Sequence, residues 1–203
     1  MFIAIEGIDG AGKTSVAKII AKRLNYNYSS QKALSQYMEI DESVYLSYCT
    51  NYRNNVDSDK NKMFWLYATS CLLAADISNV VCDRHLGTVY FWYGCDDNEI
   101  ISHAVYSLSK KPDITFLLNV SVQKALERVR SKFNDEDIET AMYKREIEKA
   151  NMADKFSLKV EEYFQKFNLP YKILETDNMT IPEVADGILS YVSSMKIATE
   201  VIK

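Results

Sequence analysis

Eight residues near the N-terminus carry the most specific chemical pattern in the chain. The stretch Gly7-Ile-Asp-Gly-Ala-Gly-Lys-Thr14 fits the spacing GxxxxGK followed by Ser or Thr at every fixed position. Glycines let backbone N–H groups turn inward around a phosphate chain, while Lys13 supplies a compact positive charge and Thr14 a hydroxyl for Mg²⁺. The pattern predicts a phosphate cradle, or P-loop, with these binding residues: Gly7, Asp9, Gly10, Ala11, Gly12, Lys13, Thr14 and Ser15.

A second pair of charged residues, Asp83 and Arg84, ends a β-branched run that begins at residue 79. A carboxylate at that strand end predicts a Mg²⁺ contact beside the cradle, either direct or through water. The guanidinium of Arg84 would face the same cleft, where it can hold a phosphate through two parallel hydrogen bonds. The alternative is a surface Asp–Arg pair, and the position at a strand end favours the functional interpretation. We expect the neighbouring His85 to be structural.

Three cations, Arg128, Arg130 and Lys132, lie at the end of a predicted helix and precede the acidic segment 134–139. One interpretation is a solvated helix face. The other is a mobile lid near residues 130–145 whose cations close over a transferring phosphoryl group. The sequence leaves both open, and Arg128 and Arg130 are the best candidates for a role at the phosphates.

Alternating strands and helices are expected to position these groups. Apolar runs predict strands at residues 2–6, 26–30, 79–83, 113–120 and 171–174. Helical spacing or capping residues predict helices over 14–25, 62–77, after Ser121, over 143–167, and from the capping box Thr180 to Glu183. The alternation predicts an α/β, three-layer P-loop fold in one domain over residues 1–203, with a five-stranded parallel sheet flanked by helices. Ligands then bind at the carboxyl ends of the strands, near 6–14, 83–88 and after 120.

The bulk composition argues against several classes of protein. The 203 residues are 47% hydrophobic and carry a formal net charge of −4, whereas a binder of nucleic-acid polymers needs a basic surface. We see no apolar run near the roughly 20 residues of a membrane span, and no secretory signal. The four cysteines form no CxxC pair and no metal spacing. We therefore expect reduced thiols in a cytoplasmic protein that binds no membrane.

Together these motifs resemble the thymidylate kinase family of nucleoside monophosphate kinases. FIAIEGIDGAGKTS is similar to that family's P-loop, and CDRH with Thr88 resembles its DR segment. PDITFLLNVSVQKALERVRSK resembles the family's strand and lid approach. The resemblance implies transfer of the γ-phosphoryl group of ATP, with Mg²⁺, to thymidylate or a related nucleoside monophosphate. It also implies a homodimer packed through helices beside the nucleotide site.

The resemblance further implies roles for single residues. Asp9 would hydrogen-bond the 3′-hydroxyl of the acceptor, Arg84 would hold its phosphate, and Asp83 would help to position Mg²⁺. Lys13, Arg84 and Arg130 would be the catalytic cations, while Arg128 would contact the donor nucleotide. Arg128, Arg130 and Lys132 would belong to the lid.

The sequence departs from the family pattern on the acceptor side. Ser70 stands where the family has an arginine that reads the base, and Leu66 where it has a stacking phenylalanine. The segment 29–33 replaces a REPGG-like motif, 91–93 replaces AYQ, and Asp137 replaces the arginine of RIE. Because the donor-side motifs are kept, we expect phosphoryl transfer. Because the base-reading residues are replaced, we expect that thymidylate is not a highly efficient acceptor.

Two alternatives stay open at this point. A deoxynucleoside kinase would want a carboxylate base soon after the second strand, and the nearest are Glu39 and Glu42. A P-loop protein that binds nucleotide without turnover would fit the replaced acceptor motifs. The aromatic clusters at 64–67 and 90–93 are expected to be mostly core, with one or two rings available to stack on a base.

Overall fold

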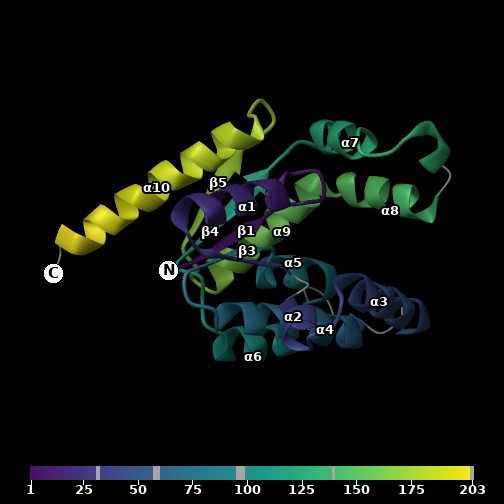
Figure 1. Ribbon diagram of the computed structural model, residues 1–203, viewed down its shortest axis with the longest axis horizontal. Coiled ribbons are helices and arrows are strands. Elements are labelled where there is room, and N and C mark those ends of the chain that lie inside the picture. The colour runs from purple at the N-terminus through teal and green to yellow at the C-terminus, as the bar shows by residue number, and fades with distance from the viewer. Residues whose placement is uncertain (31–32, 57–59, 95–98, 139, 202–203) are drawn as a thin grey trace.

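The computed structural model describes residues 1–30, 33–56, 60–94, 99–138 and 140–201 of the chain (Figure 1). Cys95 and Glu139 therefore lie outside the described residues. Among the described residues, no helix is both long enough and apolar enough to cross a membrane.

Five parallel strands form one sheet in the order β2-β3-β1-β4-β5. Their bounds are β1 Phe2–Glu6, β2 Asn27–Ser30, β3 Val80–Asp83, β4 Ile114–Asn119 and β5 Tyr171–Glu175. Strand β1 is central because it pairs with both β3 and β4, and all five of its residues are buried. Every predicted strand is present, with bounds that differ by at most one residue, and the predicted fold class is confirmed.

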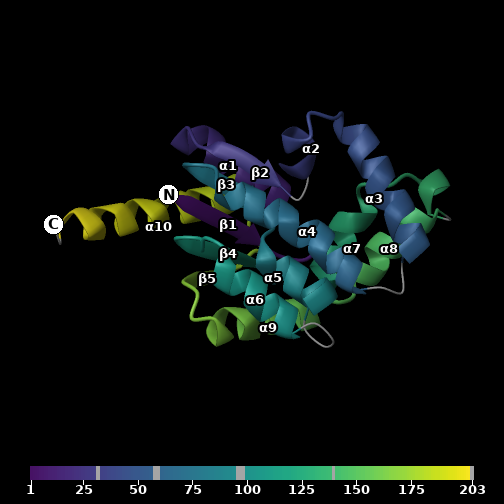
Figure 2. The same cartoon turned by 90° about the horizontal axis from the view of Figure 1, so that it is seen from below.

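Helices cover both faces of the sheet and complete three layers (Figures 1 and 2). On one face lie α1 Lys13–Leu24 and α10 Ile181–Val201. The other face carries α4 Lys60–Ala75, α5 Leu86–Val89, the π-helical turn η1 Tyr90–Gly94, α6 Glu99–Leu108 and α9 Ala153–Lys166. The remaining elements are α2 Ala33–Tyr37, α3 Glu42–Val56, α7 Val122–Arg130, the 3₁₀ turn η2 Asp135–Asp137 and α8 Ala141–Ala150.

Capping groups begin two of the helices as the sequence predicts. The Ser121 hydroxyl accepts a hydrogen bond from the Lys124 amide, 3.3 Å away, at the start of α7. At the start of α10, the Glu183 carboxylate accepts from the Thr180 amide at 2.7 Å, and the Thr180 hydroxyl accepts from the Glu183 amide at 3.4 Å.

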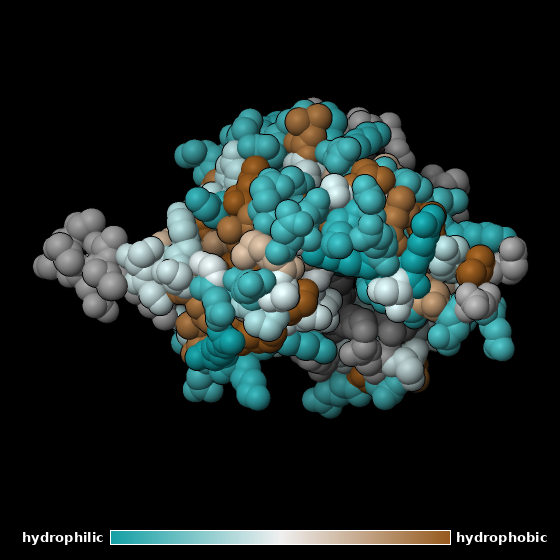
Figure 3. Space-filling view, turned by 90° about the horizontal axis from the view of Figure 1, so that it is seen from above, coloured by the Kyte–Doolittle hydropathy of each residue, from teal (hydrophilic) through white to brown (hydrophobic). Residues whose placement is uncertain are grey.

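Seen from the side of α7 and α10, the surface is mainly hydrophilic with small apolar areas (Figure 3). The helices thus turn polar faces to water and apolar faces to the sheet.

The single helix predicted over 143–167 is wrong, because the chain forms two helices, α8 and α9, with a break at Asn151 and Met152. Phe156, Val160 and Phe164 of α9 face the core, since each is at most 1% exposed. No proline or glycine marks the break. Helix α9 packs beneath the sheet, whereas α8 runs out beside α7 (Figure 1).

Candidate active site

The predicted phosphate cradle lies between the end of β1 and the start of α1. Two of its glycines adopt the left-handed backbone region, Gly10 with φ 89° and Gly12 with φ 88°. A Cβ atom at Gly10 would lie 2.9 Å from the Ala125 carbonyl oxygen, and one at Gly12 would lie 2.6 Å from Ile181 Cδ1. The backbone conformation therefore favours glycine at both positions, and at Gly10 the close approach of the Ala125 backbone also requires it. The amide of Ala11 donates to the Ile8 carbonyl at 3.1 Å and closes the turn.

Lys13 is the first residue of α1 and points into the cradle. Its side chain is only 4% exposed, and its Nζ atom donates to the Ile8 carbonyl oxygen at 2.6 Å. Burial, together with the nearby Arg84 guanidinium, lowers the pKa of Lys13 to about 7. The ammonium group is thus held at the centre of a loop built to surround anions.

The two predicted Mg²⁺ ligands, Thr14 and Asp83, lie together. The Thr14 hydroxyl donates to Asp83 Oδ2 at 2.5 Å, and the Tyr28 hydroxyl donates to the same oxygen at 3.2 Å. The other oxygen, Asp83 Oδ1, is buried and has no hydrogen-bond partner among the described residues. A buried carboxylate oxygen without a donor, beside a hydroxyl, is a suitable ligand set for a hard cation. Metal binding by these two residues stays a prediction.

Arg84 follows β3 in a conformation that is uncommon for a side chain with a Cβ atom. Its φ is 71°, and its amide donates to the Ile5 carbonyl at 3.0 Å. Such backbone geometry persists only when surrounding contacts hold it, and it is frequent at functional sites. The geometry turns the guanidinium toward the P-loop, where it donates to Asp9 Oδ1. Arg84 is therefore paired with Asp9 of the P-loop, and both side chains are largely shielded from water.

Lys149 contacts the same carboxylate and was not singled out from the sequence. Its ammonium nitrogen lies 2.9 Å from Asp9 Oδ2 and 2.9 Å from Glu146 Oε1. Burial opposes the charged form of Asp9, yet Arg84, Lys13 and Lys149 together hold its pKa well below the usual range. In the sequence, Lys149 is one lysine in a long charged helix, so only the tertiary structure identifies it.

Glu6 is a second residue that the sequence analysis did not assign. It is fully buried at the end of β1 and accepts hydrogen bonds from the His85 amide at 3.0 Å, the Thr88 amide at 3.1 Å and the Thr88 hydroxyl. Burial raises the pKa of Glu6 to about 7, against the effect of these donors. Glu6 thereby joins the P-loop strand to the turn that carries Arg84. A charge inside the apolar run FIAIE was the available signal.

The predicted lid cations either contact another group or are exposed in this structure. Arg128 Nη2 donates to the Thr176 carbonyl oxygen at 2.6 Å, beyond the end of β5. Arg130 and Lys132 are exposed. Asp137, which replaces the family's arginine, accepts from the Asn134 amide at 3.0 Å and completes a capping box at η2. The roles of the lid cations at the phosphates stay predictions.

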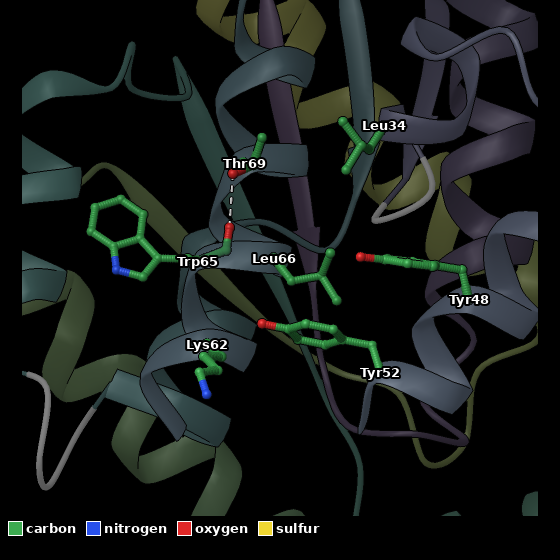
Figure 4. Close-up of a pocket in the computed structure, with 7 residues that line it drawn as sticks. All are labelled: Leu34, Tyr48, Tyr52, Lys62, Trp65, Leu66 and Thr69. Atoms are coloured by element: carbon green, nitrogen blue, oxygen red, sulfur yellow. Dashed lines mark hydrogen bonds between the residues drawn. The ribbon is translucent and has the colours of Figure 1, made fainter. Parts of the chain in front are cut away.

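A pocket of about 320 Å³ lies between α2, α3 and α4 (Figure 4). In Figure 4 the Leu66 side chain points toward Tyr48 and Tyr52, whose rings stack at 6.0 Å, while the indole of Trp65 points away from them. Its lining residues are Leu34, Tyr48, Tyr52, Lys62, Trp65, Leu66 and Thr69. The pocket is thus mainly aromatic and apolar, with hydroxyl groups and one lysine at its walls.

Two aromatic and hydroxyl contacts lie deeper on α4. Ser70 is fully buried, and the hydroxyl group of the buried Tyr45 lies beside it. The rings of Tyr67 and Tyr93 stack at 5.4 Å with an interplanar angle of 10° and join α4 to η1. Packing within the protein therefore occupies the surroundings of Ser70, in keeping with the predicted core role of most of these aromatic residues.

Comparisons with known proteins agree on one family. The family model described as thymidylate kinase matches residues 5–188. A probable thymidylate kinase of Methanocaldococcus jannaschii is 29% identical over 205 residues, covering 96% of this chain and 97% of that protein. One from Archaeoglobus fulgidus is 30% identical over 158 residues, covering 73% and 79%. A solved deoxyadenosine kinase from M. mycoides with bound dCTP shares the fold at 18% identity, with a TM-score of 0.58 over 96% of this chain and 100% of that one.

Proposed function

The chain belongs to the thymidylate kinase family and is a nucleoside monophosphate kinase, and on that premise we propose that its phosphoryl donor is ATP with Mg²⁺. The observation that carries the proposal is the geometry around the P-loop. The Thr14 hydroxyl, next to Lys13 in the chain, contacts Asp83 at 2.5 Å, while Asp9, 3.8 Å from Lys13 Nζ, pairs with Arg84. A metal and donor site therefore adjoins a second site for an anion and a sugar.

The donor triphosphate would lie in the P-loop, against the backbone amides of the loop and the N-terminus of α1. Thr14 and Asp83 would hold Mg²⁺, which supplies charge neutralisation to the β- and γ-phosphates when bound. Lys13 would bind the same phosphates, and Arg128 would contact the donor nucleotide. The buried Asp83 Oδ1, without a hydrogen-bond donor among the described side chains, supports this assignment.

In the proposed reaction, an oxygen of the acceptor phosphate attacks the γ-phosphorus of ATP. The bond from that phosphorus to the β–γ bridging oxygen breaks, so ADP leaves and the acceptor becomes a diphosphate. The attacking phosphate is largely ionised at neutral pH, hence no strong general base is needed. Lys13, Arg84 and, after lid closure, Arg130 would neutralise charge and align the two phosphates.

On the acceptor side, we propose that Arg84 binds the phosphate, Asp9 the sugar hydroxyl, and the pocket between α2, α3 and α4 the base. Tyr48 and Tyr52 offer aromatic contact there, whereas Leu66 offers only apolar contact. Because Ser70 cannot supply a charged hydrogen bond to a base carbonyl, thymidylate would be an acceptor of modest efficiency.

A deoxynucleoside acceptor is the competing proposal, since similar solved structures include deoxyadenosine kinases. A hydroxyl nucleophile needs a carboxylate base close to the end of β2. The sequence from Ser30 runs Gln31-Lys32-Ala33-Leu34-Ser35, and the first carboxylate along the chain after β2, Glu39, is exposed beyond α2. Asp83, the register partner of Ser30, is already assigned here to Mg²⁺. The chemistry of this segment therefore favours a monophosphate acceptor.

A screen of ADP release tests the proposal. The protein with ATP and Mg²⁺ is offered each common nucleoside monophosphate and each deoxynucleoside in turn. We expect release with at least one monophosphate and none with the nucleosides. Release with nucleosides alone would support the competing proposal, and ATP binding without release would indicate a protein that does not turn over.

We also propose a cytoplasmic homodimer. Within the described residues, α6 exposes Ile100 to 87% and Leu108 to 86%, and such an apolar stripe can pack against a second copy. Cys49, Cys71 and Cys82 are buried and none of the three is in a disulfide, which suits a reducing compartment. Size-exclusion chromatography with light scattering tests the dimer, because the measured molar mass should be twice the 23.3 kDa of one chain.

A further inference from the structure

The Asp9 carboxylate lies near cationic side chains from three separate parts of the fold. Its Oδ1 pairs with the Arg84 guanidinium and lies 3.8 Å from Lys13 Nζ, whereas its Oδ2 lies 2.9 Å from Lys149 Nζ. Arg84 and Lys149 therefore hold opposite oxygens of one carboxylate. The Asp9 side chain is only 12% exposed, so these charge-assisted contacts are shielded from water.

Lys149 joins helix α8 to the P-loop through its contact with Asp9. It lies on α8, which follows the predicted lid segment, and it is the residue before the helix ends at Ala150. Glu146, one turn earlier, contacts the same ammonium group at 2.9 Å. Of the cations on α7 and α8 whose contacts the structure describes, Lys149 is the one on Asp9, whereas Arg128 contacts the Thr176 carbonyl.

The Lys149 ammonium group and the Asp9 carboxylate can each form further hydrogen bonds beyond these contacts. An ammonium group has three N–H donors, and Asp9 and Glu146 account for two of those of Lys149. A carboxylate has about four lone-pair sites, so Asp9 can hold Arg84 and Lys149 and still accept from a hydroxyl. The terminal torsion of aspartate is broad, and a carboxylate held at one oxygen alone would rotate about it.

We propose that Lys149 is a positioning residue for the acceptor and acts through Asp9. By holding Oδ2 while Arg84 holds Oδ1, Lys149 fixes the orientation in which the carboxylate meets the acceptor sugar. It also couples the position of α8, and with it the lid segment, to the acceptor side of the site. The inference rests on the proposed function, because it takes Asp9 to be the sugar-binding group.

Replacing Lys149 by Met tests the inference, since Met keeps an unbranched side chain only one atom shorter and removes the charge. With thymidylate as the acceptor, we expect the acceptor KM to rise by about tenfold or more while the ATP KM stays within about twofold. Lys149→Arg, which keeps the positive charge, should have an acceptor KM close to that of the wild type. Lys155→Met, at an exposed position on α9, is the matched control and should behave as the wild type. Lys149→Gln serves as a second neutral variant if the Met variant does not fold.

A double-mutant cycle with Asp9→Asn shows whether Lys149 acts through Asp9. Measured as thymidylate dissociation constants, Lys149→Met should have little further effect when Asp9→Asn is already present. An unchanged acceptor KM in active Lys149→Met, or a full effect of that change on top of Asp9→Asn, would overturn the inference alone. Absence of transfer by the wild type to every monophosphate would overturn the proposed function, and the inference with it.

Discussion

The hydroxyl of Thr14 donates a 2.5 Å hydrogen bond to Asp83 Oδ2 although the two residues are 69 positions apart in the sequence. The contact exists because β1 and β3 are parallel neighbours whose carboxyl ends meet at one edge of the sheet. The hydrogen bond places Thr14, the last residue of the P-loop motif, against the carboxyl end of β3, which Arg84 follows in the chain. The active-site geometry is thus a direct consequence of the strand order.

Lys13→Ala should abolish phosphoryl transfer while the fold stays intact. The side chain lies inside the cradle and bonds the Ile8 carbonyl at 2.6 Å, so its loss removes a buried charge from the phosphates without opening the core. We expect kcat to fall by at least about a hundredfold. Steady-state assays and a thermal melt on the same sample measure both effects. Wild-type turnover in a folded variant would refute the role of the P-loop lysine.

Arg84→Ala should damage use of the acceptor far more than binding of ATP. The guanidinium is held at Asp9, whereas the predicted metal ligands Thr14 and Asp83 contact each other. Loss of a charged hydrogen bond to phosphate predicts a rise in acceptor KM or a fall in kcat of about tenfold to a hundredfold. Kinetics against each substrate separate the effects. Unchanged acceptor constants would make the pair with Asp9 purely structural.

Glu6→Gln should change how stability depends on pH. The pKa of Glu6 is about 7 in the folded protein and near 4.5 when exposed, so the folded state binds the extra proton between these values. Glu6 therefore contributes stability that is present below about pH 4.5 and is lost as pH rises through about 7. The shift corresponds to about 3 kcal/mol, or on the order of 5–10 °C in Tm.

The measurement is the Tm difference between Glu6→Gln and the wild type from pH 4.5 to 7. This difference isolates Glu6, because His85, whose pKa burial lowers to about 4, acts in the opposite direction in both proteins. We expect the difference to move in favour of the Gln variant as pH rises. A constant difference would mean that Glu6 titrates normally.

Thymidylate should not be a highly efficient acceptor. Ser70 is fully buried beside Tyr45. Serine carries no charge, so it cannot give a base carbonyl the charged hydrogen bond that an arginine at this position would donate. Leu66 gives the pocket apolar contact, and Trp65, which offered a possible stacking ring, points away from the tyrosine pair (Figure 4). The check is kcat/KM for thymidylate beside the other monophosphates. A value near about 10⁶ M⁻¹s⁻¹ with clear preference for thymidylate would contradict the prediction.

The sheet and the donor side could be predicted from the sequence because their signals are local. Apolar runs give each strand within one residue, and the P-loop residues are consecutive in the chain. The contacts of Lys149 and Glu6 could not be predicted in the same way. Lys149 lies on α8 just before the break from α9 at residues 151–152, and nothing in the composition there signals a break. The partners of Glu6 depend on the packing of α5 against β1.

Transfer of labelled phosphate from ATP tests the central claim most directly. The wild type is incubated with γ-labelled ATP, Mg²⁺ and thymidylate or another monophosphate, with Lys13→Ala as the blank. We predict that the label appears in a nucleoside diphosphate in equal amount to the ADP formed, and that the blank shows neither. Label found only in inorganic phosphate, or ATP bound without any transfer to a monophosphate, would contradict the account.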